Sequence, residues 1–207
     1  MKLGRICVVT SKASAYFALA TRLRKAGLPF SSALPDSDLE KCGLVLTTAA
    51  EAGALGGKSV PLESLDADPG VFKGQVLSRL KDEQDVVLVG VDPGERIGLA
   101  AFYGQTELAF DTLGSRAVVC SRVKAFAKGI RGSGVLVRVG DGDRLLAGKL
   151  VEELAREVPE ATIELVDESG TSVGGSKTHG MQRDEVAAAR IAFRKGRVVS
   201  PGTRSRD

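Results

Sequence analysis

Residues 86–102 read VVLVGVDPGERIGLAAF, which is two apolar runs separated by a short polar turn. The first run is rich in β-branched residues and ends at Asp92, and Pro93 and Gly94 then reverse the chain. This pattern predicts two antiparallel strands, Val86–Val91 and Ile97–Tyr103, joined by a tight turn. A carboxylate at the end of a buried strand points to ligand chemistry, because sites in open α/β sheets form at the carboxyl ends of the strands.

The chain beyond this hairpin alternates strands with helices. The predicted elements are the strand Glu107–Leu113, the helix Ser115–Lys128, the strand Val135–Val139, the helix Asp143–Glu157, the strand Thr162–Val166 and the helix Asp184–Arg194. Their order is βββαβαβα, with short connections. We therefore expect an α/β fold with a mixed five-stranded sheet in the order 3-2-1-4-5 and helices on both faces.

A second, smaller α/β segment precedes this sheet. It is predicted to contain the strands Arg5–Thr10, Pro29–Leu34 and Cys42–Thr48 and the helices Ala15–Ala26 and Val71–Asp82, with a loop and one short strand at 52–70. We expect a small Rossmann-like domain at 1–83, the main domain at 84–199 and a basic tail at 200–207. The loop TSKAS at 10–14 either caps the first helix or binds an anion at its N-terminus.

The composition fits a cytoplasmic globular protein. Apolar residues make up 43% of the chain, no apolar run approaches the ~18 residues of a membrane span, and the N-terminus lacks a secretory signal pattern. Cys7, Cys42 and Cys120 are few, odd in number and widely spaced. This favours free thiols in a reducing compartment over a disulfide framework or a zinc site.

Acidic residues gather at the predicted carboxyl ends of the parallel strands and at the start of the last helix. They are Asp92, Asp141, Asp143, Asp167, Glu168, Asp184 and Glu185. Carboxylates that share one edge repel each other, and divalent cations with oxygen ligands are the usual reason for such a cluster. Asp143 and Glu185 suit helix capping, whereas Asp92, Glu168 and Asp184 together predict a site for Mg²⁺ or Mn²⁺. Two such ions about 3.5–4 Å apart support phosphodiester hydrolysis.

The same segments resemble the RuvC/YqgF branch of the ribonuclease H-like superfamily. VGVDPGERIGLAAF is similar to the first-strand motif of that branch, which ends in D-P-G followed by x-x-x-G. The other matching segments are VRVGDGDRLLAGKLVEEL, LVDES and QRDEVAAARIAF, in the family's order. The resemblance covers about residues 86–195 and does not include residues 1–80.

The resemblance implies a metal-dependent endonuclease or resolvase that acts on structured DNA or RNA. Asp92, Glu168 and Asp184 match the family's catalytic, metal-binding acids, and Asp141 matches a fourth ligand. Two positions depart from the family pattern, because Ser169 stands where YqgF-type proteins carry arginine and Arg138 where RuvC-type resolvases carry glutamate. The second departure puts the cleavage of four-way junctions in doubt.

Basic residues near the acidic cluster are expected to bind nucleic acid. The loop before the last helix holds Lys177, His179 and Arg183, and the C-terminal segment holds Arg194, Lys195 and Arg197. Residues 190–207 carry six lysines and arginines against one acid, although the whole chain has a net charge of only +3. Because carboxylates repel phosphate, these basic segments are the predicted contact surface.

Two other functions agree with the same sequence. One is a non-catalytic module that keeps the fold to bind nucleic acid or protein. The other is an actin-like ATPase or sugar kinase, whose phosphate loop also follows a first strand. Such proteins need two copies of the fold to enclose ATP, and this chain has one D-P-G strand. The sequence leaves open whether the chain forms a homodimer.

Overall fold

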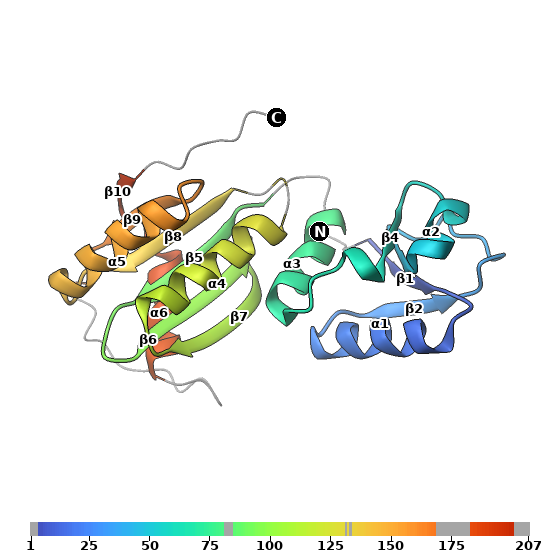
Figure 1. Cartoon of the computed structure of the whole chain (residues 1–207), viewed down its shortest axis with the longest axis horizontal. Helices are drawn as coiled ribbons and strands as arrows, with labels where there is room; N and C mark the ends of the chain where they lie inside the picture. The colour runs from blue at the N-terminus through green and yellow to red at the C-terminus, as the bar shows by residue number, and fades with distance from the viewer. Residues whose placement is uncertain (1–3, 81–84, 131, 133, 169–182, 201–207) are drawn as a thin grey trace. The chain divides into compact units, whose positions relative to one another are not determined.

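The computed structural model describes residues 4–80, 85–130, 132, 134–168 and 183–200 (Figure 1). The chain divides into two compact units, Met1–Gln84 and Asp85–Asp207, called here the N-terminal unit and the C-terminal unit. Among the described residues, no helix is long and apolar enough to cross a membrane.

The N-terminal unit is built on a parallel four-stranded sheet in the order β2-β1-β3-β4. Its strands are β1 (Ile6–Val9), β2 (Phe30–Ala33), β3 (Leu44–Thr47) and β4 (Ser59–Pro61), and its helices are α1 (Ala13–Lys25), α2 (Ala49–Leu55), the 3-10 turn η1 (Leu62–Ser64) and α3 (Pro69–Leu80). Strands β1 and β3 are buried along their whole length, as expected of central strands in a parallel sheet. Gly27, with φ of 66°, follows the end of α1 where the sequence predicted a helix end.

The prediction of a loop at 52–70 is wrong for the first residues of that stretch, because they belong to helix α2 (Ala49–Leu55). The helix has no buried residue, so no apolar periodicity marks it in the sequence. The carboxylate of Glu51 anchors it. That carboxylate accepts bonds from the hydroxyls of Thr10, Ser11, Thr47 and Thr48 and from the Ser11 N–H. The loop at 10–14 therefore does hold an anionic group, which the chain itself supplies.

The prediction of three free thiols is wrong for two of the cysteines. Cys7 in β1 and Cys42 just before β3 form a disulfide, with their Cα atoms 5.8 Å apart. Both residues are buried in one small apolar cluster with Val9 and Val45, so the neighbouring strands bring together cysteines that are 35 positions apart. Cys120 has a free, buried thiol. The predicted cytoplasmic location is therefore no longer supported by the cysteines.

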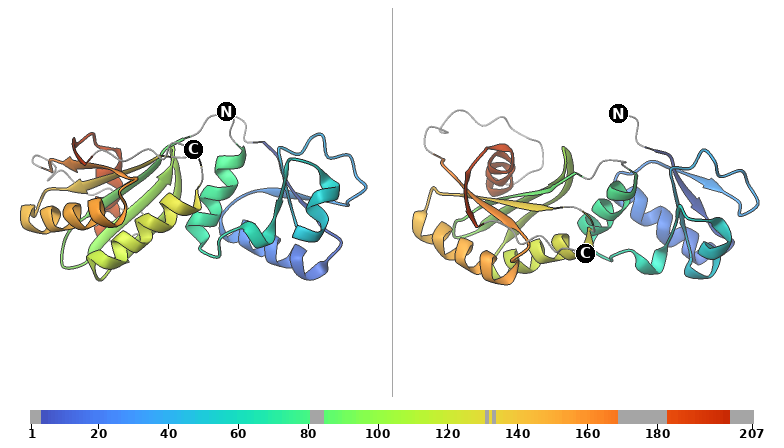
Figure 2. Two further views of the ribbon diagram at one scale, coloured as in Figure 1. Left: turned by 45° about the horizontal axis from the view of Figure 1, so that its top comes forward. Right: turned by 90° about the horizontal axis from the view of Figure 1, so that it is seen from above.

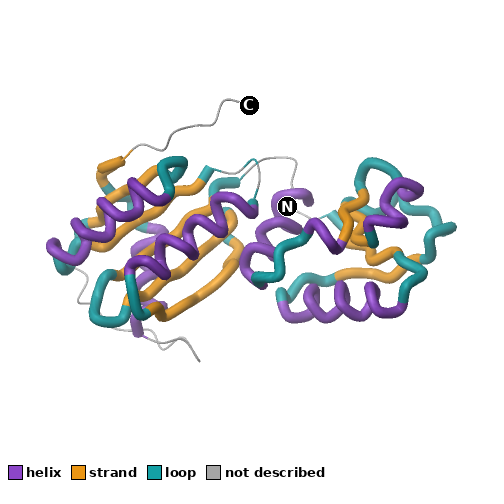
Figure 3. Tube along the Cα trace, in the orientation of Figure 1, coloured by secondary structure: helices purple, strands orange, loops and turns teal. Residues whose placement is uncertain are grey.

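The C-terminal unit is a mixed six-stranded sheet with helices on both faces. Its strands are β5 (Val87–Asp92), β6 (Ile97–Tyr103), β7 (Thr106–Leu113), β8 (Val135–Gly140), β9 (Thr162–Val166) and β10 (Arg197–Ser200), in the order β10-β9-β8-β5-β6-β7. Helices α4 (Arg116–Gly129) and α5 (Arg144–Glu157) cover one face, and α6 (Arg183–Phe193) covers the other (Figures 2 and 3).

The predicted number of five strands is wrong, because β10 adds a sixth. The neighbours among the first five strands are those expected. Strand β10 pairs antiparallel with β9, and it lies in the basic C-terminal segment, for which the sequence predicted no strand. Without it, β9 would be an unpaired edge of the sheet, which proteins usually protect.

Candidate carboxylate site

Asp92 is the last residue of β5, the strand between β6 and β8 in the middle of the sheet. Strands β5, β8 and β9 run parallel, so their carboxyl ends share one edge. Glu168 follows the end of β9 at this edge, and Asp141 follows the end of β8. Asp184 lies in the first turn of α6.

Two glycines allow α6 to lie directly on the strands β5 and β6. A Cβ atom at Gly90 would overlap the Ala188 carbonyl oxygen and would lie 2.5 Å from the Ala192 nitrogen. A Cβ atom at Gly98 would overlap the Asp184 carbonyl oxygen and would lie 3.1 Å from the Asp184 Cβ. Gly98 is also the register partner of Asp92. The absence of a side chain at Gly98 therefore admits α6.

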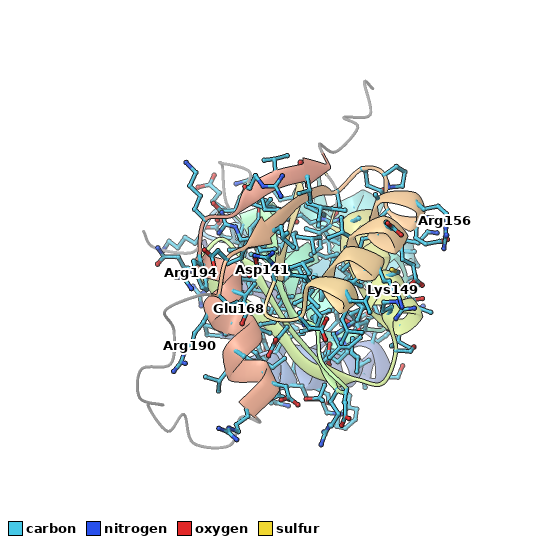
Figure 4. The ribbon with its side chains drawn as sticks, turned by 90° about the vertical axis from the view of Figure 1, so that its left-hand side faces the viewer. Asp141, Lys149, Arg156, Glu168, Arg190 and Arg194 are labelled. Carbon is cyan, nitrogen blue, oxygen red and sulfur yellow. A yellow bond between two sulfur atoms is a disulfide. The ribbon has the colours of Figure 1, made fainter. Side chains whose placement is uncertain are left out.

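Glu168 and Asp141 are fastened to each other through the backbone. The Glu168 N–H donates to the Asp141 carboxylate over 3.0 Å, and the Gly142 N–H donates to the Glu168 carboxylate, also over 3.0 Å. A side chain at position 140 would overlap the Glu168 carboxylate, so Gly140 leaves the space that it occupies. Figure 4 shows Asp141 and Glu168 adjacent, between α6 and α5. One oxygen of Asp141 is thus committed to positioning the Glu168 backbone.

The electrostatics of Asp92 connect three of the predicted site residues. Burial, and to a lesser extent the charges of Glu168 and Asp184, together raise the pKa of Asp92 from its ordinary value of 3.8 to about 6. These three carboxylates come from distant parts of the sequence and act on one another at one edge of the sheet. The negative charge there has no compensating cation among the causes of the shift.

The donor chemistry of this edge fits Mg²⁺ or Mn²⁺, because carboxylate oxygens are the ligands that hard divalent cations prefer. The raised pKa of Asp92 marks the repulsion that such a cation would relieve. Within the described residues, however, no three Asp, Glu, His or Cys side chains are arranged as a ligand group. The carboxylates therefore fit the cation in kind and charge, and in this conformation they are not drawn together around one point.

The remaining predicted residues have separate positions. Asp143 caps α5 by accepting bonds from the N–H groups of Leu145 and Leu146, as predicted. Glu185 contacts the Thr112 hydroxyl of β7 over 3.5 Å, which ties α6 to the sheet. Gly94, in the turn after Asp92, is not among the described glycines with positive φ.

The predicted nucleic-acid-binding residues are spread along α6 and β10. Arg183 begins α6, Arg194 and Lys195 follow it, and Arg197 begins β10. Figure 4 shows Arg190 and Arg194 on the α6 side of the carboxylates, and Lys149 and Arg156 on the α5 side. Lys177 and His179 lie outside the described residues.

Arg138 has a role that the sequence comparison with resolvases did not suggest. Its guanidinium bonds the Glu164 carboxylate over 2.8 Å and the Ala192 carbonyl over 2.7 Å, and Glu164 also accepts a bond from the Gly196 N–H. Arg138 and Glu164 are register partners on adjacent strands. The sequence contains a signal for this ion pair, because each of two apolar strands carries one charged residue and the two charges are opposite. The pair fastens the end of α6 to the sheet.

Comparisons with known proteins add little to this description. No protein-family model and no curated protein match the sequence. Among solved structures, the chain is similar to Marinitoga piezophila Argonaute in complex with a 5′ OH guide RNA. The TM-score is 0.31 and the identity 10%, over 79% of this chain and 39% of that chain. The match thus spans less than half of that chain, and a likeness this low supports no conclusion about function.

Proposed function

We propose that the C-terminal unit is a ribonuclease H-like hydrolase of the RuvC/YqgF type that cleaves phosphodiester bonds in structured nucleic acid with Mg²⁺ or Mn²⁺. The observation that carries this proposal is the convergence of Asp92, Glu168 and Asp184 at one sheet edge, where burial and mutual repulsion raise the pKa of Asp92 to about 6. A cluster of this kind costs stability, and functional sites are where such costs are commonly found.

Each of the three acids is held by a different part of the fold. Asp92 is held by a strand with partners on both sides. Glu168 is oriented by the Gly142 N–H, and Asp184 is placed by the close contact of α6 with Gly98. Bound divalent ions would supply an activated water and would stabilise the leaving oxygen. The protein's own contribution is to hold the three carboxylates at one edge.

The test is cleavage of a panel of branched and linear DNA and RNA by the full chain with Mn²⁺ or Mg²⁺. We expect Asp92→Asn to abolish cleavage, because it removes one ligand charge with little change of shape. Glu107→Gln is the matched control, since Glu107 is an exposed acid on β7 of the same unit. Millimolar Mn²⁺ should also raise the thermal midpoint of the unmutated chain and not that of Asp92→Asn.

A non-catalytic nucleic-acid-binding module is the competing proposal. It is favoured by the arrangement of the described carboxylates, which are not gathered as a ligand group. Binding of the panel without cleavage, together with a thermal midpoint that Mn²⁺ leaves unchanged, would establish this alternative and exclude the hydrolase.

A further inference from the structure

A cavity of about 540 Å³ lies beside the carboxylate site, within the C-terminal unit. Its size falls in the range of about 300–1,000 Å³ that is usual for small-molecule sites. The lining residues come from the position after β8, from α5, from β9 and from the edge strand β10. They are Asp141, Arg144, Gly148, Val151, Glu152, Leu165, Arg197 and Val199.

The α5 side of the cavity is open at Gly148. Ala147, Leu150 and Leu154 of this helix are buried, whereas a Cβ atom at Gly148 would meet no other atom within 4 Å. Glycine inside a helix is destabilising relative to alanine, and alanine would fit here without a clash. The helix thus keeps a space open that its own packing does not require.

The lining combines apolar side chains with two arginines. Val151, Leu165 and Val199 supply the apolar part. Arg144 and Arg197 are exposed residues of the lining, and neither side chain makes a hydrogen bond or ion pair in the part of the chain that the structure describes. A guanidinium group without a protein partner is well suited to bind a phosphate, because its N–H groups match two phosphate oxygens.

The acids of the lining add a second kind of recognition. Asp141 and Glu152 are the two carboxylates that line the cavity, and carboxylates accept hydrogen bonds from the amino groups of nucleobases. Asp141 also accepts the backbone N–H of Glu168, so one residue belongs both to the cavity and to the proposed hydrolytic site. A ligand in the cavity would therefore lie next to that site.

We propose that this cavity binds one unpaired nucleotide of a nucleic-acid strand, with the base on the apolar part of the lining and the phosphates on Arg144 and Arg197. The placement beside the reacting bond rests on the proposed hydrolase function. The nucleotide site itself depends only on the cavity and its lining. An unpaired nucleotide is the part of structured nucleic acid that exposes an apolar base face beside a charged backbone.

The test measures binding of AMP, CMP, GMP and UMP to the full chain by calorimetry, with inorganic phosphate as a separate probe. Gly148→Leu should fill the cavity and weaken nucleotide binding by roughly tenfold or more. Gly53→Leu is the matched control, because Gly53 is also helical and a Cβ atom there meets nothing within 4 Å. The double variant Arg144→Gln with Arg197→Gln should bind a monophosphate no better than the corresponding nucleoside.

Two results would overturn the proposal: equal binding by Gly148→Leu and the unmutated chain, or equal affinity for inorganic phosphate and nucleotides. The second result would place the anion on surface arginines alone. Cleavage and Mn²⁺-induced stabilisation are measured on the same variants. If Gly148→Leu loses nucleotide binding and no variant cleaves, the cavity stands and the hydrolase fails. If Gly148→Leu cleaves as the unmutated chain does and also binds nucleotides equally well, the hydrolase stands and the nucleotide site fails.

Discussion

Asp92 is the residue on which the proposed chemistry of the C-terminal unit depends, and its titration makes a direct prediction. Its pKa is raised to about 6 in the fold, so the folded chain holds this proton more tightly than the unfolded chain. The contribution to stability is therefore fully present below the ordinary pKa of 3.8 and is lost as the pH rises through about 6.

Asp92→Asn should remove this pH dependence. In urea unfolding without metal, the free energy of unfolding of the variant should rise relative to that of the unmutated chain between pH 4 and pH 7, by about 1 kcal/mol. A difference of one pKa unit corresponds to about 1.4 kcal/mol, so the full rise in the pKa of Asp92 would imply a larger gain. The expected gain is smaller because the half-buried carboxylate is screened by solvent. Glu107→Gln should show no such gain. An Asp92→Asn chain that parallels the unmutated chain at every pH would show that neither burial nor the neighbouring carboxylates raise the pKa of Asp92.

Glu51 is the opposite case, in the N-terminal unit. Hydrogen bonds from Ser11, Thr10 and Thr48 lower the pKa of its carboxyl below the ordinary value of 4.5. A lowered pKa contributes stability that is present above the ordinary value and is lost as the pH falls toward the folded value. The carboxylate joins the loop after β1 to α2. It therefore stabilises the unit at the carboxyl ends of the strands of the parallel sheet.

Glu51→Gln should destabilise the chain at neutral pH, because the amide replaces one acceptor oxygen by a donor that faces other donors. The difference from the unmutated chain should shrink as the pH falls below about 4. Unfolding followed by far-UV circular dichroism over this range measures it. Glu40→Gln, at an exposed acid of the same unit, is the control. A constant difference at all pH values would mean that the charge of Glu51 is not what the hydroxyls stabilise.

At the scale of elements, the contact of α6 with the sheet should depend on Gly98. Gly98→Ala should lower the free energy of unfolding by about 1–3 kcal/mol or more, because a methyl group there overlaps the α6 backbone at Asp184. It should also weaken stabilisation by Mn²⁺, since Asp184 moves with the helix. Gly114→Ala is the control, because a Cβ atom at Gly114 meets nothing within 4 Å. Loss of stability with an unchanged response to Mn²⁺ would separate Asp184 from the metal site.

The elements that the sequence predicted are those whose burial follows a local pattern. Strand β6 has the predicted bounds and is buried at every residue, so its apolar run was a reliable signal. Helix α2 buries nothing, and β10 is a short edge strand with two exposed residues, Arg197 and Val198. Neither has a pattern of spacing that distinguishes it from a loop.

Features that depend on contacts between distant segments could not be predicted from the sequence. The strand ends predicted that Asp92 and Glu168 share an edge, because parallel topology follows from element order. The disulfide of Cys7 with Cys42 depends on which strands become neighbours. The cavity lined by Asp141 and Gly148 depends on how α5 lies beside β9 and β10. A single glycine in a helical sequence does not predict such a cavity.

At the scale of the whole molecule, the proposed function raises the question of which basic residues would bind nucleic acid. Two groups are available at the end of the chain. Arg190 and Arg194 belong to α6 and its end, whereas Arg204 and Arg206 lie beyond the last strand, outside the described residues. Arg197 belongs to β10 and to the cavity, so a deletion that removes it would also remove a strand.

A chain that ends at Ser200 therefore tests the tail without cutting the sheet. Each phosphate contact contributes about −0.9 to the slope of log affinity against log salt on duplex DNA, so loss of two arginines changes the slope by at most about two units. We expect a smaller slope for this truncated chain, measured by fluorescence anisotropy with duplex and branched DNA. Arg190→Gln with Arg194→Gln, which keeps every strand, provides the comparison. If the truncation leaves the slope unchanged and the double variant lowers it, the phosphates bind along α6 and not to the tail. If neither changes it, the predicted C-terminal contact surface is wrong.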